Sequence, residues 1–298
     1  MRRVLTLSFG LVLGLAVTAC GNDSAADRSS TGPNVVVTTN ILGDIVRQVV
    51  GDQASVQVLM PLGADPHDFA LSAKQADAMA KADLVVTNGA GIEEKMQSVI
   101  DRVAGDGVPV FTFADHVTMR GEDPHIWTDP LTLEPAVRAF GERAATLAGV
   151  DAAKIATQTA TYAASLKQLD QSVRGTLAAI PADRRVLVTN HEVFGYFAAR
   201  YDLRVLGAVI PSLTTDAQAS AKDLEALAAT IRDQHVAAIF AETTKPTKLA
   251  EALAKEVGSS VQVVELYTES LGKPGSSAAT YVGMVQANAD LIAGALGA

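Results

Sequence analysis

The chain has 298 residues, of which 48% are hydrophobic and 19% charged, and its formal net charge is −9. The apolar fraction suffices for a buried core and excludes global disorder, and the length predicts one large domain or two ordinary ones. The acidic balance argues against nucleic acid as a partner, because a phosphate backbone binds basic surfaces. A single cysteine excludes an intramolecular disulfide and a zinc site built from several thiolates. Metal or acid–base chemistry would therefore depend on the five histidines and the carboxylates.

The first 20 residues read MRRVLTLSFGLVLGLAVTAC. The uncharged stretch from Val4 to Val17 has the length of a signal-peptide apolar region and is short of the ~20 residues that span a bilayer. The small residues before Cys20 resemble a bacterial lipobox, in which the cysteine is lipidated. We expect a signal peptide over 1–19, a lipid on Cys20, a polar tether over 20–33 and an extracytoplasmic, membrane-anchored protein. An ordinary signal peptide or a buried apolar helix is the alternative.

From residue 34 onward, short β-rich runs alternate with alanine-rich helical stretches. The runs are apolar enough to indicate parallel strands that are buried on both faces. The expected strands are 35–39, 55–60, 84–88 and 109–113, followed by 186–190, 204–209, 237–242 and 261–266. The sequence thus predicts an α/β fold with two parallel-sheet lobes, at 34–150 and 181–298.

The segment between the lobes, 151–180, predicts a long linking helix. Apolar residues recur in it at intervals of three, four or seven, which places them on one helical face. Thirty helical residues would extend about 45 Å, enough to pass both lobes. Two shorter helices broken near Gly175 are the alternative.

Four residues suited to metal binding follow the carboxyl ends of predicted strands: His67, His125, His191 and Glu269. Ligands of open parallel sheets bind in the crevice at those ends, so the two lobes could share one site. Separations of 58, 66 and 78 residues exclude a local zinc finger.

His67 and His125 each follow Asp-Pro, where proline restricts the backbone of the turn. Acidic side chains lie beside both histidines and can accept the second imidazole N–H. These neighbours are Asp65, Asp68, Glu122 and Asp123.

The remaining candidates are weaker. His235 precedes its strand and should lie at the opposite edge of the sheet, so we assign it no role in the site. His116 follows a strand without a supporting motif; we expect it to be exposed, with weak accessory binding as the alternative. Glu242 ends a strand at the crevice, and we expect it to support a ligand or to replace Glu269 as the fourth one.

These residues lie in motifs that resemble the metal-binding solute-binding lipoproteins of bacterial ABC transporters for zinc and manganese. The motifs are PLGADPHDF, DPHIWTDP, TNHEVFGYFAARYDL, IFAETTKP, ELYTESLG and TYVGMVQANADLI. The resemblance runs from about Val35 to Leu296. It implies two α/β lobes joined by a rigid helix, one metal ion between them, and delivery of that ion to a membrane permease driven by a separate ATPase.

Carried over by position, the resemblance implies His67, His125, His191 and Glu269 as metal ligands. The family usually has aspartate where Glu269 stands, so the geometry of this fourth ligand is open, with water or Glu242 as alternatives. Three imidazoles and one carboxylate favour zinc, whereas manganese prefers more oxygen ligands and remains the alternative. The loop before His125 lacks the long His- and acid-rich insertion of many zinc-specific relatives, which weakens the preference for zinc.

Other functions have less support. A metallohydrolase would leave one zinc position open for water, and the chain contains no GxSxG or HExxH motif, so we expect a protein that is not an enzyme. A surface adhesin and a binding protein for an organic or chelated solute are further alternatives; the low aromatic content, 5%, disfavours the last of these. We expect a monomer.

Overall fold

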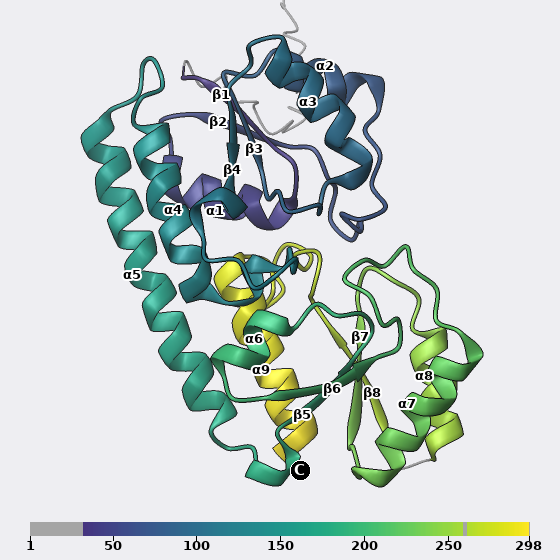
Figure 1. Cartoon of the computed structure of the whole chain (residues 1–298). Helices are drawn as coiled ribbons and strands as arrows, with labels where there is room; N and C mark the ends of the chain where they lie inside the picture. Colours follow the sequence, from purple (N-terminus) through teal and green to yellow (C-terminus); the bar gives the residue numbers. More distant parts are fainter. Residues whose placement is uncertain (1–31, 259–260, 298) are drawn as a thin grey trace, which may run out of the picture.

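The computed structural model describes residues 32–258 and 261–297. The expected signal peptide 1–19, the lipidation site Cys20 and nearly all of the tether 20–33 lie outside the described residues. Two α/β units, here called the first and second lobes, are stacked beside one long helix (Figure 1).

Each lobe contains a four-stranded, wholly parallel sheet. The first sheet has the order β2-β1-β3-β4 and the second the order β6-β5-β7-β8. The strands are β1 (Asn34–Val37), β2 (Ser55–Val58), β3 (Leu84–Thr87), β4 (Val110–Thr112), β5 (Val186–Thr189), β6 (Arg204–Ala208), β7 (Ala238–Glu242) and β8 (Gln262–Leu266). All eight strands were expected from the sequence, and the prediction of two parallel-sheet α/β lobes is confirmed.

Helices cover both faces of each sheet, as parallel strands require. Those of the first lobe are α1 (Asn40–Val50), α2 (Ala73–Ala80), α3 (Gln97–Gly105) and α4 (Pro130–Ala144). Those of the second lobe are α6 (Gly195–Arg200), α7 (Ala221–Asp233), α8 (Lys248–Val257) and α9 (Tyr281–Gly297). Four 3₁₀ turns complete the described elements: Glu94–Met96, Phe113–His116, Ile126–Thr128 and Ala182–Arg184.

The linking helix is α5 (Ala152–Leu177), unbroken through Gly175, so the alternative of two shorter helices is wrong. Asp151 begins it by accepting hydrogen bonds from the backbone N–H of Ala153 and Lys154 at 3.0 and 3.2 Å. Its 26 residues extend about 39 Å. Helices α4 and α9 pack against it, which fixes it to both lobes.

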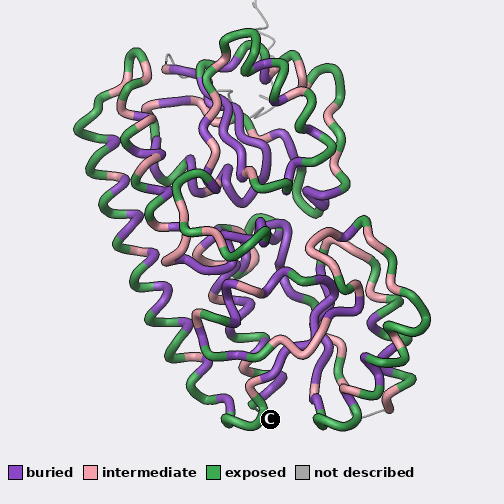
Figure 2. Tube along the Cα trace, in the orientation of Figure 1, coloured by how far each residue is buried: buried purple, intermediate pink, exposed green. Residues whose placement is uncertain are grey.

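The largest hydrophobic core is shared by the two lobes. It runs from β1 and α1 through α4 and α5 to α9, and it includes Phe140, Leu166 and Ile292, all with exposed fractions of 0%. Separate cores lie between the first sheet and α2–α3 and between the second sheet and α7–α8. Figure 2 shows the buried residues following the strands of both sheets and the inner side of α5. Burial of this shared apolar surface holds the lobes together along the α5 side.

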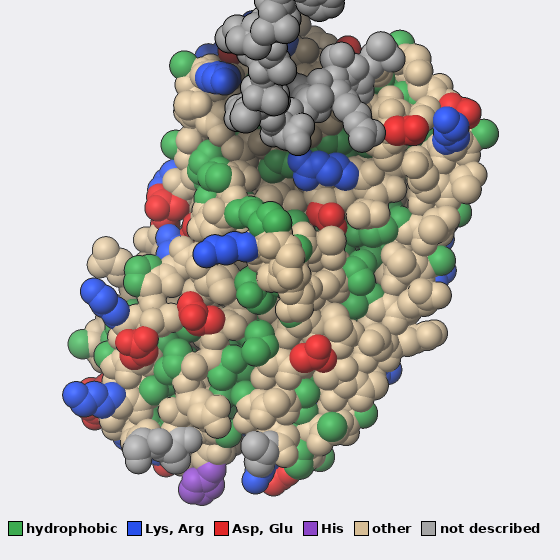
Figure 3. Space-filling model, turned by 180° about the vertical axis from the view of Figure 1, so that it is seen from behind, with side chains coloured by type: hydrophobic (Ala, Val, Ile, Leu, Met, Phe, Trp, Pro, Cys, Tyr) green, Lys and Arg blue, Asp and Glu red, His purple; other side chains and the backbone are tan. Residues whose placement is uncertain are grey.

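Among the residues that the structure describes, no helix combines the length and apolar character needed to cross a membrane. On the face shown in Figure 3, acidic and basic side chains are interspersed rather than gathered into a patch of one sign.

Candidate metal centre

The structure brings His67, His125, His191 and Glu269 together between the two lobes. One ligand atom from each lies within 4.8 Å of the others. The exposed fractions of the four residues are 3%, 0%, 0% and 1%, so the cluster is shielded from bulk water. It is the one such group of His, Cys, Asp and Glu among residues 32–258 and 261–297.

Five of the six separations among these atoms have the lengths found in a tetrahedral metal site, and the sixth, between His67 and His191, is within 4.8 Å. The Nε2 atom of His125 lies 3.4 Å from that of His67 and 3.2 Å from that of His191. The Oε1 atom of Glu269 lies 3.8, 3.6 and 3.2 Å from the Nε2 atoms of His67, His125 and His191. Because the edge of a tetrahedron is about 1.6 times its centre-to-vertex distance, these five separations correspond to distances of about 2.0–2.3 Å from a central ion, close to those of zinc from nitrogen and oxygen ligands.

The two Asp-Pro-His turns share the same hydrogen bond between the aspartate side chain and the histidine backbone. Asp65 accepts a hydrogen bond from the backbone N–H of His67 at 2.9 Å, and Asp123 accepts one from that of His125 at 3.0 Å. Each aspartate thus closes a tight turn around its proline and turns the imidazole into the crevice. The repeated motif therefore has a structural reason.

The expected imidazole–carboxylate pairs are confirmed only in part. Asp123 Oδ1 lies 2.7 Å from Nδ1 of His125, as expected, which directs Nε2 to the cluster. The expectation is wrong for Asp65, whose Oδ1 binds the backbone of His67, and for Asp68, which pairs with Lys95. Glu122 is exposed.

His191 is oriented entirely from the second lobe. Its backbone carbonyl accepts a hydrogen bond from the Thr189 hydroxyl at 2.7 Å, directly after β5. Its Nδ1 makes a short hydrogen bond to Oε1 of Glu242, the last residue of β7. Since Nδ1 and Nε2 lie on opposite sides of the ring, Glu242 holds His191 with Nε2 facing the cluster.

Buried carboxylate oxygens in the cluster lack hydrogen-bond partners. Both oxygens of Glu269 and the Oε2 atom of Glu242 are in this state among the described residues. A buried carboxylate without donors is costly, and a bound cation removes that cost. The donor set therefore fits a metal ion.

Proton affinities in the cluster diverge. Burial, helped by the charge of His191, lowers the pKa of His67 to about 4, and burial holds the pKa of His125 well below its usual value. Burial also acts to lower the pKa of His191, but Glu242 and then Glu269 outweigh it and raise this pKa to about 10. Burial raises the pKa of Glu269 to about 7. These shifts favour protonation of His191 over that of His67 and His125.

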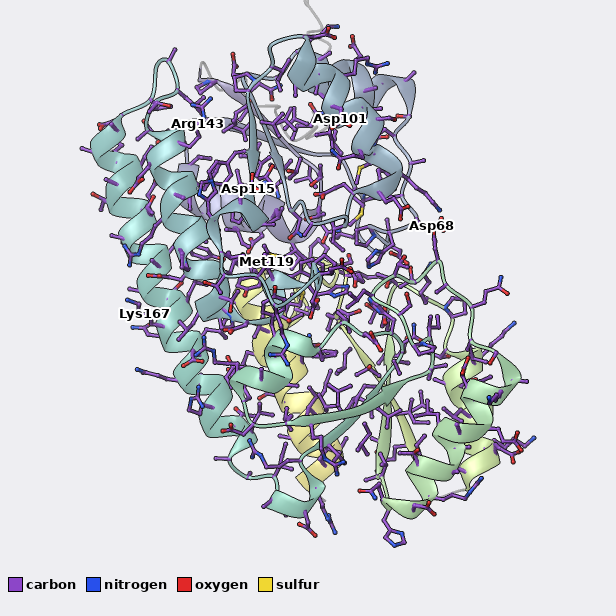
Figure 4. All side chains as sticks on the ribbon, viewed as in Figure 1. Asp68, Asp101, Asp115, Met119, Arg143 and Lys167 are labelled. Atoms are coloured by element: carbon purple, nitrogen blue, oxygen red, sulfur yellow. The ribbon has the colours of Figure 1, made fainter. Side chains whose placement is uncertain are left out.

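A polar bridge joins the lobes at the rim of the cluster. Asp65 Oδ2 accepts hydrogen bonds from the Thr215 hydroxyl at 2.6 Å and from Lys245 Nζ at 2.7 Å. Lys95 of the first lobe pairs with both Asp68 and Asp216, the latter at 3.0 Å. Figure 4 shows Asp68 on the side of the molecule away from α5, where loops of the two lobes meet. No local sequence pattern predicts this bridge, because Asp65 and Thr215 lie 150 positions apart.

The other two histidines lie outside the cluster. His116 is exposed and stacks on Phe111 with ring centroids 4.6 Å apart. His235 is exposed between α7 and β7, at the amino end of that strand.

A family model described as the periplasmic component A of a zinc-uptake complex matches residues 35–295. The chain belongs to this family. The resemblance to metal-binding solute-binding proteins of ABC transporters is thereby confirmed.

Individual relatives of the family cover nearly the whole chain. TroA of Treponema pallidum, named a zinc-binding protein, is 33% identical over 97% of this chain and 96% of its own. The manganese-binding lipoprotein MntA of Bacillus subtilis is 29% identical over 94% and 95%. The manganese ABC transporter substrate-binding lipoprotein PsaA of Streptococcus pneumoniae is 27% identical over 97% and 96%. The solved structure of Treponema pallidum TroA superposes with a TM-score of 0.85, over 90% of this chain and 100% of that one.

Proposed function

We propose that this protein captures a divalent metal ion, zinc, outside the cytoplasm and delivers it to the permease of an ABC transporter driven by a separate ATPase. The observation that carries the choice of zinc is the donor set, three imidazole nitrogens and one carboxylate oxygen that lie within 4.8 Å of one another. TroA is named for zinc and MntA and PsaA for manganese, which supports a metal as the cargo.

The ligands in this proposal are His67, His125, His191 and Glu269. Glu242 is given the supporting role, since its Oε1 is hydrogen-bonded to the far side of the His191 ring. Division of the chain into lobes at 34–150 and 181–298, with the linker 151–180 between them, is part of the same proposal.

Manganese is the second candidate cargo. It is favoured by the free Oε2 of Glu269, because two oxygens from this residue would raise the coordination number towards the one that manganese prefers. Glutamate is one methylene longer than the aspartate usual at this position and reaches either arrangement.

Binding, rather than catalysis or adhesion, fits the site. Four buried side chains converge on one centre, whereas a catalytic zinc keeps a position open to water and substrate. The chain is proposed to act as a monomer that engages the permease.

We propose that the protein is held at the membrane by a lipid on Cys20. The lipobox-like sequence and the lipoprotein names of MntA and PsaA support this location. Replacement of Cys20 by serine should shift the protein from the membrane fraction to the soluble extracytoplasmic fraction in cell fractionation. Unchanged membrane retention would contradict lipid anchoring.

Zinc should bind at one ion per chain and raise the melting temperature. At a free concentration 100 times its Kd, a ligand stabilises the fold by about 2.7 kcal/mol, which for a chain of 298 residues is about 4–5 °C. Metal analysis and native mass spectrometry of protein purified without added metal measure the stoichiometry. Thermal melts with zinc or manganese measure the shift in melting temperature. No bound metal together with a metal-independent melt would contradict metal capture.

Growth experiments separate the two ions. Zinc outcompetes manganese at most sites whichever is physiological, so affinity alone does not identify the cargo. In a strain that lacks this protein, supplementary zinc should restore growth; restoration by manganese alone would show the manganese alternative to be right.

A further inference from the structure

The segment Thr268–Leu271, which carries Glu269, follows β8 of the second lobe but is hydrogen-bonded to the first lobe. The indole N–H of Trp127 donates to the carbonyl of Thr268 at 2.7 Å. Asn40, at the start of α1, accepts a hydrogen bond from the backbone N–H of Leu271 at 2.8 Å. Residues on both sides of Glu269 are thus attached to the first lobe.

Ser270 adds further links in the same direction. Its hydroxyl oxygen accepts hydrogen bonds from Nδ2 of Asn40 at 3.1 Å and from the backbone N–H of Gly63 at 2.8 Å. The exposed fraction of Asn40 is 5% and that of Ser270 is 1%. Hydrogen bonds are electrostatically stronger in such a water-poor environment, so these links hold the segment firmly.

The attachment of the chain to the second lobe ends one residue earlier. Asn288 of α9 accepts a hydrogen bond from the backbone N–H of Tyr267 at 2.9 Å and donates to the Tyr267 carbonyl at 2.8 Å. The chain therefore passes from one lobe to the other between Tyr267 and Thr268.

His191, in contrast to the Glu269 segment, is hydrogen-bonded to its own lobe. Its backbone is bonded to Thr189, its ring is held by Glu242, and the N–H of the next residue, Glu192, donates to the Ser212 carbonyl at 2.9 Å. All of these partners belong to the second lobe. Its contacts with the first lobe are those of the cluster itself, with His67 and His125.

We propose that Asn40 is the positioning residue for Glu269, and that it holds this second-lobe side chain in place from the first lobe, which carries His67. This inference rests on the proposed metal-binding function.

A double-mutant cycle tests the role of Asn40 through zinc affinities of the full chain, measured by competition with a chelating dye. Asn40→Ala should weaken zinc binding about tenfold, the scale of residues that orient ligands. In the Glu269→Ala background, Asn40→Ala should change the Kd by less than about twofold, because its effect passes through Glu269. Equal effects in both backgrounds would overturn the proposal.

Asn288→Ala is the matched control. Asn40 and Asn288 are both 5% exposed; Asn40 binds the backbone of Leu271 from the first lobe, and Asn288 binds that of Tyr267 from the second. The Asn288 variant should leave the Kd within about twofold, and hydrogen exchange of metal-free protein should show loss of protection at Leu271 only in the Asn40 variant. A larger loss of affinity for Asn288→Ala would show that Glu269 belongs with the second lobe.

A second variant covers failure of Asn40→Ala to fold. Ser270→Ala removes the links to Gly63 and Asn40 with a smaller change, and it should reproduce the dependence on Glu269 in the same cycle. If the unaltered protein binds no zinc, the proposed function fails. If it binds zinc and the cycle is additive, only the positioning role of Asn40 fails.

Discussion

Replacement of His125 by alanine is expected to weaken zinc binding by about 10²–10³-fold. Structural zinc sites are worth about 10–16 kcal/mol, so one of four ligands accounts for about 3–4 kcal/mol. His125 has no exposed surface, and its Nε2 lies within 3.6 Å of three other ligand atoms. Water cannot easily replace it in this shielded position. Competition titration with a chelating dye measures the change, and far-UV circular dichroism checks that the variant is folded.

His116→Ala and His235→Ala are the controls. Both histidines are exposed and lie outside the cluster, so zinc affinity should change by less than about twofold. His116 stacks on Phe111, and its loss should lower stability slightly without changing the zinc Kd. A loss in either variant comparable to that of His125→Ala would show that zinc binds elsewhere.

Zinc affinity is also expected to rise steeply with pH between 6 and 9. The pKa values of His67 and His125 lie at about 4 and well below 6.5, so both rings are already neutral in this range. His191, with a pKa of about 10, carries a proton that zinc must displace. The displacement of one proton makes the affinity increase about tenfold per pH unit.

Below pH 7 the slope should become steeper, because Glu269, with its pKa raised to about 7, is then protonated as well. Affinities measured across this range, together with calorimetry in buffers of different ionisation enthalpy, give the number of protons released. An affinity independent of pH between 7 and 9 would contradict a proton on His191.

Glu242→Gln provides the matched variant for this dependence. The amide oxygen can still accept the hydrogen bond from Nδ1 of His191, but the negative charge that raises the pKa of His191 is lost. The pKa of His191 should fall, so the affinity should level off at a lower pH than in the unaltered protein. The same pH profile in both proteins would show that Glu242 does not control the proton.

The secondary structure and the histidine positions of the candidate centre were predictable because they depend on local patterns. Buried parallel strands are continuous apolar runs, and β1 and β3 are such runs, with exposed fractions of 0% at Val36 and Val85. The parallel arrangement then places the ends of several strands at one crevice, which brings residues as distant as His67 and His191 together. The unbroken α5 follows from one apolar face with a capping aspartate before it.

The contacts that orient the ligand side chains could be predicted only in part from the sequence. Proximity along the chain suggested that Asp65 and Asp68 would support the His67 ring, yet Asp65 turns to Lys245 and Thr215 of the other lobe. A carboxylate takes whichever donors the folded chain places within reach, and those donors lie 150 or more residues away. Asn40 directly follows a predicted strand, as the ligands follow theirs, and this position was the only local sign of its role.

By itself, the sequence determined the two-lobed α/β architecture, the long helix between the lobes and the histidines of the crevice, because these depend on periodicity and on the ends of apolar strands. Only the tertiary structure decided the close approach of the ligand atoms, the raised pKa of His191 and the attachment of Glu269 to the first lobe. These properties depend on burial and on contacts between distant segments, which exist only once the shared core has brought the lobes together.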